Sequence, residues 1–126
     1  MTTIKIVAGQ VSMLADLNSS PTALKIWEAL PIEGTANIWG DEVYFEIPVL
    51  AEPEPDARVE VDVGELGYWP VGHAFCVFFG PTPVSNDERP RAASPVNILG
   101  RLKGDAIQFR LVPNGAQVSI MRADHS

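Results

Sequence analysis

Apolar and polar residues alternate in short segments along most of the chain, and glycine, proline or small polar residues separate these segments. Alternation with a period of two predicts strands that bury one face. Thr3 to Val7 and Val11 to Leu17 are predicted to form a first hairpin, with Gly9-Gln10 at its turn. The same pattern predicts strands over 35–39, 42–47, 58–63 and 95–102, and a last hairpin over 106–112 and 116–121.

A different pattern follows the first hairpin and predicts the single helix. Ser20 is a suitable N-cap, and Pro21 fits the first helical position, where its missing N–H costs nothing. Apolar residues then recur at helical spacing until Pro31, which ends the segment. We expect one helix of roughly ten residues, which is short enough to depend on packing against a sheet.

The most apolar stretch, Gly64 to Pro83, is the part around which we expect the rest of the chain to be organised. Its central run, Ala74 to Phe79, is bounded by turn-forming residues and predicts a buried strand. Tyr68 and Trp69 precede this run and are interpreted as part of a glycine-flanked turn. A proline follows Trp69, so the bond between them is a candidate for a cis peptide bond.

Together these elements indicate one mostly-β domain over residues 1–126. Many closely spaced strands in so short a chain indicate a closed or nearly closed barrel of about eight to ten strands. The longest polar segment, 85–94, is interpreted as a surface loop, with a lid as the alternative.

Charge and cysteine content narrow the range of partners. The net charge is −7, whereas nucleic acids and anionic membranes are bound by basic surfaces, so both partners are disfavoured. Cys76 is the single cysteine, and no internal disulfide can form. The sequence shows neither a signal-peptide pattern nor an apolar run of membrane-spanning length. We expect a cytoplasmic protein, and the oligomeric state stays open.

Three stretches resemble the small cyclophilin-like proteins of bacteria and archaea, a family without an assigned function. They are NIWGDEVYFEIPV, VGELGYWPVGHAFCVFFGPTP and PVNILGRL, beginning at Asn37, Val63 and Pro95. The resemblance covers most of the chain. It implies a closed cyclophilin-like β-barrel of about eight strands, with one helix in the N-terminal half packed at an end.

The sequence departs at two positions from the cyclophilin prolyl isomerases, to which that family is related. Cyclophilin isomerases carry an arginine on the strand after the first helix, but the corresponding strand here has Glu46. The glutamine of the isomerase motif corresponds to Phe75, which has no hydrogen-bonding group. No arginine lies between Met1 and Ala57. An acid cannot polarise an amide as a guanidinium does, so isomerisation by the familiar mechanism is disfavoured.

Metal-dependent and nucleophilic chemistry are also disfavoured by the residue pattern. His73, His125 and Cys76 do not have the spacing of metal ligands, and we expect neither a metal nor another cofactor. The apolar neighbours of Cys76 favour an inert buried thiol over a nucleophile. Asp41 and Glu42 are interpreted as solvated acids at a turn.

The remaining hypothesis is an aromatic binding surface with one acid, which suits a peptide or a small apolar or cationic ligand. Trp39, before a Gly-Asp turn, belongs to the same group of aromatic residues. The alternative is that these aromatics cover the ends and seams of the barrel. The residues expected to bind are Tyr44, Glu46, Tyr68, Trp69 and Phe75, with Asn97 as a polar anchor.

We therefore predict a small-molecule or short-peptide binding module, with no catalytic residues assigned. A divergent prolyl isomerase is the second hypothesis, and an arginine that reaches the groove from 89, 91 or 101 would favour it. The third is a structural or regulatory subunit of a hydrolase assembly, because cyclophilin-like domains also occur in such assemblies.

Overall fold

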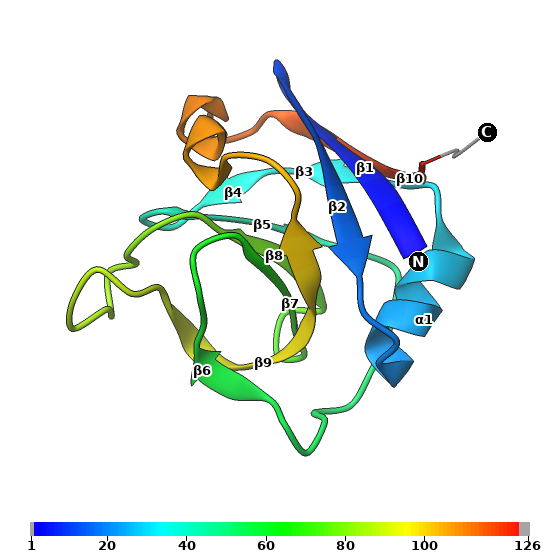
Figure 1. Ribbon diagram of the computed structural model, residues 1–126, viewed down its shortest axis with the longest axis horizontal. Helices are drawn as coiled ribbons and strands as arrows, with labels where there is room; N and C mark the ends of the chain where they lie inside the picture. The colour runs from blue at the N-terminus through cyan, green and yellow to red at the C-terminus, as the bar shows by residue number, and fades with distance from the viewer. Residues whose placement is uncertain (1, 124–126) are drawn as a thin grey trace.

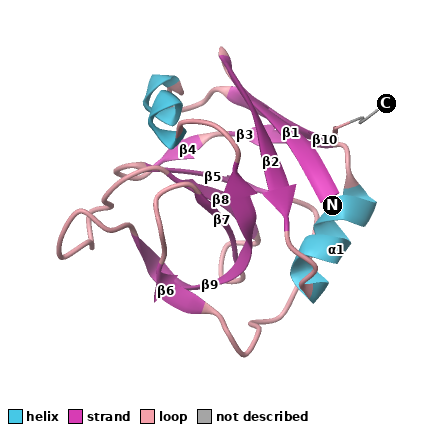
Figure 2. Cartoon of the chain, viewed as in Figure 1, coloured by secondary structure: helices cyan, strands magenta, loops and turns pink. Residues whose placement is uncertain are grey.

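Antiparallel strands are the main regular element of the structure, a computed structural model that describes residues 2–123 (Figure 1). The strands are β1 (Thr2–Ala8), β2 (Val11–Leu17), β3 (Ile32–Thr35), β4 (Asn37–Ile38), β5 (Glu42–Glu46), β6 (Arg58–Glu60), β7 (Glu65–Trp69), β8 (Ala74–Phe78), β9 (Arg91–Leu102) and β10 (Gln117–Arg122). The helical elements are α1 (Pro21–Ala29) and the 3-10 helix η1 (Ala106–Leu111), which lie at separate corners of the molecule (Figure 2).

All ten strands in residues 2–123 belong to one sheet, whose order is β3-β10-β1-β2-β9-β7-β8-β5-β4, with β6 paired to β9. The prediction of a closed barrel of about eight strands is therefore wrong in two respects. There are more strands, and no hydrogen-bonded ladder joins β3 to β4 at the two edges of the described sheet. The chain itself connects these edges, since Ala36 alone separates β3 from β4.

Strand β3 also approaches β5, which is the neighbour of the other edge strand, β4. A Cβ atom at Gly34 would lie 2.9 Å from the ring of Phe45, so the two strands touch through a glycine and an aromatic ring. Ala36 is buried, and its N–H donates to the carbonyl of Ala116 at 2.8 Å. The edge strand β3 thus contacts β5 through side-chain packing and is joined to the other edge strand, β4, by Ala36; this contact cannot be inferred from alternation along the chain.

The first hairpin and the helix agree with the sequence predictions. β1 and β2 pair through Ala8 and Val11, and Gly9 takes a φ of +58° at the turn. Ser20 caps α1 by accepting a hydrogen bond from the N–H of Ala23 at 3.2 Å. The cis peptide bond of the described chain precedes Pro31, whereas the bond that follows Trp69 is trans.

The predicted strand over 106–112 is wrong, because this segment forms η1. Asp105 accepts a hydrogen bond from the N–H of Ile107, which favours a helical turn. The buried residues Ala106, Phe109 and Val112 are three positions apart, which is the repeat of a 3-10 helix. The predicted strand 58–63 is shorter than expected, since β6 ends at residue 60.

The apolar stretch does lie at the centre of the molecule, because β8 is buried on both faces. Phe75 and Val77 face the main core, whereas Cys76 and Phe78 belong to a second, smaller core. The segment before it, predicted as a turn, is β7, and it pairs with both β8 and β9. The second core is completed by Val61, Ala74, Ala92 and Val96.

Candidate binding pocket

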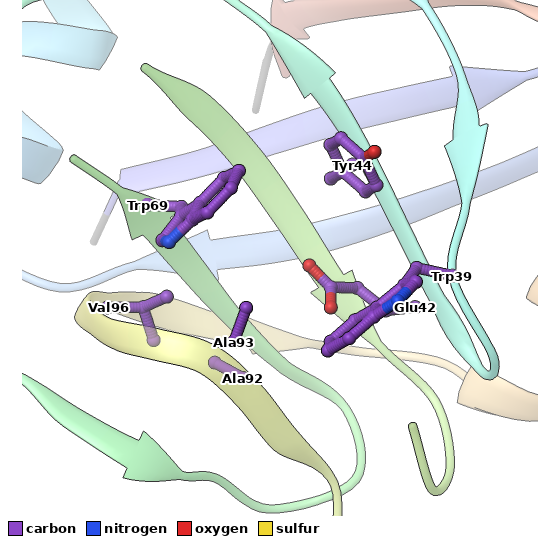
Figure 3. A pocket seen from close by; sticks show the side chains of 7 residues that line it. All are labelled: Trp39, Glu42, Tyr44, Trp69, Ala92, Ala93 and Val96. Carbon is purple, nitrogen blue, oxygen red and sulfur yellow. The ribbon is translucent and has the colours of Figure 1, made fainter. Parts of the chain in front are cut away.

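A cavity of about 220 Å³ lies above the second core, on the face of the sheet opposite the main core. Strands β5, β7 and β9 and the turn between β4 and β5 supply its walls (Figure 3). Its lining residues are Trp39, Glu42, Tyr44, Trp69, Ala92, Ala93 and Val96.

Strand register brings the two predicted aromatics Tyr44 and Trp69 to the same face. Tyr44 lies opposite Cys76 and Trp69 lies opposite Ala74, and directly opposed residues of antiparallel strands project to one side. The small side chains of β8 leave room between the two rings. Tyr44 and Trp69 therefore meet edge to face, with ring centroids 6.2 Å apart and planes at 78°.

The indole of Trp69 is held in place from two directions. Its Nε1 donates a hydrogen bond to the hydroxyl of Ser94 on β9. On the other side, a Cβ atom at Gly72 would lie 2.6 Å from the indole ring, so the absence of a side chain there gives the ring its space. The position of this wall is consequently set by contacts distant in sequence and by one neighbouring glycine.

Glu42 is the acidic residue of the cavity and is only 6% exposed. Figure 3 shows its carboxylate between the indoles of Trp39 and Trp69. Burial raises the pKa of Glu42 from 4.5 to about 7, and a hydrogen bond with the thiol of Cys76 opposes this rise. Within residues 2–123, no Lys, Arg or His side chain forms an ion pair with Glu42.

The interpretation of Asp41 and Glu42 as a pair of solvated turn acids is therefore wrong for Glu42. Asp41 does not line the cavity and pairs with Arg110 at 3.3 Å. Glu42 begins β5, and residues two apart on a strand share a face, so it joins Tyr44. That spacing was the available signal in the sequence, but the burial of this face depends on β8 and β9.

Two of the other predicted site residues lie in the main core and do not line the cavity. Tyr68 is fully buried; its hydroxyl donates to the carbonyl of Val49 at 2.6 Å and accepts from the N–H of Ala51 at 3.3 Å. Phe75 is fully buried, with its ring centroid 5.4 Å from that of Phe45. The structure thus separates these two from Tyr44 and Trp69 by the thickness of the sheet.

Asn97 is fully buried and fastens the proline-rich loop to α1. Its Oδ1 accepts from the N–H of Glu54 at 2.8 Å, and its Nδ2 donates to the carbonyl of Glu52 and the hydroxyl of Thr22, each at 3.0 Å. All of its hydrogen-bonding atoms contact protein. Glu46, at the exposed end of β5, does not line the cavity.

The arginines that would favour an isomerase occupy another part of the surface. Arg89 and Arg91 approach Glu60 at 4.0 Å, and Arg101 approaches Asp62 at 3.4 Å. No arginine of the described chain lines the cavity. Residues 2–123 bring together no group of three His, Cys, Asp or Glu side chains suited to a metal; His125 lies outside them.

The fold and the pocket define a small, predominantly β protein with an aromatic cavity around one buried acid. The model of the Cyclophilin-like family matches residues 2–121, and the chain belongs to this family, as its sequence resemblance predicted. It is similar to the solution structure of a hypothetical protein from Archaeoglobus fulgidus, with 37% identity, a TM-score of 0.82, and coverage of 97% of this chain and 95% of that one. No curated protein matches the chain.

Neither helical element of residues 2–123 has the length and hydrophobicity that crossing a membrane requires.

Proposed function

We propose that this protein is a binding module that takes a small molecule, or one side chain of a short peptide, into the cavity lined by Trp39, Tyr44, Trp69 and Glu42. The observation that carries the proposal is a buried carboxylate at the centre of an aromatic-walled cavity. Ligand sites are concave and mostly apolar, with few polar groups that orient the ligand. This cavity has the same composition.

The size of the cavity favours a small ligand. Its volume of about 220 Å³ lies below the range of roughly 300–1,000 Å³ that is typical of sites for drug-sized molecules. A folded peptide segment would not fit, but a single side chain or a compact organic molecule would.

The chemistry of the lining favours binding over catalysis. Among the lining residues, the ionisable groups are the carboxyl of Glu42 and the phenol of Tyr44. Cys76 lies beneath the cavity and is fully buried, and burial raises its thiol pKa well above the ordinary value, so it is not a thiolate nucleophile. A site with one carboxyl, one phenol and no nucleophile is suited to recognition.

The chain offers a built-in control for a test by NMR, since it has three tryptophans. Trp39 and Trp69 line the cavity, whereas Trp27 lies on α1 beneath the guanidinium of Arg122, 4.5 Å from the ring centroid. Ligands that bind as proposed should shift the indole N–H resonances of Trp39 and Trp69 and leave that of Trp27 in place. A screen of compact molecules in which no compound moves the two cavity indoles would overturn the proposal.

A further inference from the structure

We infer that the ligand of this cavity is a small organic cation, an ammonium or amidinium group on an otherwise apolar molecule, held between the aromatic rings and the carboxylate of Glu42. This inference rests on the proposed function and names its ligand class. Trp39, Tyr44 and Trp69 come from three separate positions around the acid (Figure 3). Aromatic faces attract cations, most strongly where water is excluded.

Ligands of other charge suit this arrangement less well. An anion would be repelled by Glu42 and would meet no basic side chain among the described lining residues. A purely apolar ligand would leave the buried carboxyl without a partner in the ligand, and burying an unpaired polar group is unfavourable. A cation contacts both features of the site, the acid and the rings.

The basic residues near the cavity are already paired elsewhere. Arg110 pairs with Asp41 at 3.3 Å, and Arg91, next to the lining residue Ala92, approaches Glu60 at 4.0 Å. Consequently, no cation within residues 2–123 neutralises Glu42. The missing positive charge has to be supplied by the ligand if the carboxylate is to be paired.

Cation binding should be coupled to the release of a proton from Glu42. Burial holds the pKa of this carboxyl at about 7, so much of it is protonated at neutral pH. A bound cation favours the carboxylate, and the carboxyl proton passes to solvent. In the described chain, the ionisable neighbours of Glu42 that form no ion pair are Tyr44 on β5 and Cys76 on β8. The charged groups on the surrounding elements are already paired: Asp41 with Arg110, Arg91 with Glu60, and Glu65 with Arg58.

Choline and its neutral isostere 3,3-dimethylbutan-1-ol form a matched pair of probes, because they differ in the charged nitrogen and have the same shape. At pH 8 we expect the Kd of choline to be lower than that of the neutral alcohol by about tenfold or more. Titration of the Trp39 and Trp69 indole resonances measures both values. Since choline has no titratable proton near neutrality, its affinity should rise by about tenfold between pH 6 and pH 8. Glu42→Gln should reduce the preference for choline to what the aromatic rings alone supply and should remove the pH dependence, while it still binds the neutral alcohol.

The two proposals fail in distinguishable ways. If the neutral alcohol binds as tightly as choline, or if Glu42→Gln leaves the choline preference undiminished, the inference of a cation paired with Glu42 is wrong although the cavity binds ligands. If neither probe shifts the indole resonances of Trp39 and Trp69, both the inference and the proposed binding function are overturned for compact ligands. The indole resonance of Trp27 and the dispersion of the amide spectrum report whether the variant is folded.

Discussion

Glu42 and Cys76 are buried on the same face of the sheet, where the carboxyl of Glu42 lines the aromatic cavity and the thiol of Cys76 lies beneath it. The two residues come from neighbouring strands, β5 and β8. Each affects the ionisation of the other: the thiol opposes the rise in the pKa of Glu42, and the charge of Glu42 adds to the burial that raises the pKa of Cys76.

Removing the thiol should therefore raise the pKa of Glu42 further above 7. In Cys76→Ala the carboxylate loses a hydrogen-bond donor but stays buried, so the neutral acid becomes more favourable. The carboxyl carbon-13 shift of Glu42, followed by NMR as a function of pH, measures this directly. Cys76→Ser restores a donor and should give a lower pKa than Cys76→Ala. An unchanged or lowered pKa in the alanine variant would contradict the assigned contact.

Stability should decrease as the pH rises from about 4.5 to 7, because Glu42 has a higher pKa in the folded protein than in the unfolded chain. Below 4.5 the carboxyl is protonated in both states and no penalty arises. Above 7 it is ionised in both states, and the folded protein carries the full cost of burying the charge, on the order of 3 kcal/mol.

Glu42→Gln has no such charge and provides the comparison. Urea denaturation of both proteins between pH 4.5 and 8 should show the variant gaining stability relative to the natural chain across this window. If the free energies of unfolding of the two proteins change in parallel with pH, Glu42 does not titrate near neutrality.

Gly72→Ala should displace the indole of Trp69 without changing any charge. A Cβ atom at this position would lie 2.6 Å from the ring, so the ring has to move. We expect the nuclear Overhauser contacts between Trp69 and Tyr44 to be lost. We also expect choline to bind several-fold more weakly. Val71→Ala, at a neighbouring exposed position, is the control and should leave both measurements unchanged.

Asn97→Ala should release the proline-rich loop and destabilise the protein by about 2 kcal/mol or more, because the N–H of Glu54 loses its acceptor. Faster amide hydrogen exchange at Glu54 and a lower melting temperature are the measurements. Ligand affinity at the cavity should not change, since Asn97 does not line it. Loss of binding in a folded Asn97→Ala protein would support the earlier hypothesis that this residue is a ligand anchor.

The protein should not accelerate the cis–trans exchange of short Xaa-Pro peptides. No guanidinium of the described residues reaches the cavity, and Glu42 cannot replace a cationic donor. NMR exchange spectroscopy with and without the protein tests this expectation. Acceleration that disappears in Glu42→Gln would instead establish an isomerase with an unfamiliar site.

Elements specified by local interactions were predictable from the sequence. The first hairpin follows from alternation around Gly9, and α1 follows from the Ser20 cap and helical spacing. Alternation also misled, because Ile107, Phe109 and Leu111 fit a strand although Ile107 and Leu111 are exposed and the segment is helical. In a segment this short, the pattern of apolar residues does not distinguish the two-residue repeat of a strand from the three-residue repeat of a 3-10 helix.

For the candidate site, the sequence indicated the family and named Tyr44 and Trp69, together with Tyr68, as candidate binding aromatics. Tertiary structure alone decided that Tyr68 faces the core and that Glu42 is buried in the cavity. The physical reason is strand register: pairing across β5, β8 and β7 selects the face on which each side chain lies. A shift of one residue would exchange the two faces, and this choice depends on contacts between distant parts of the chain.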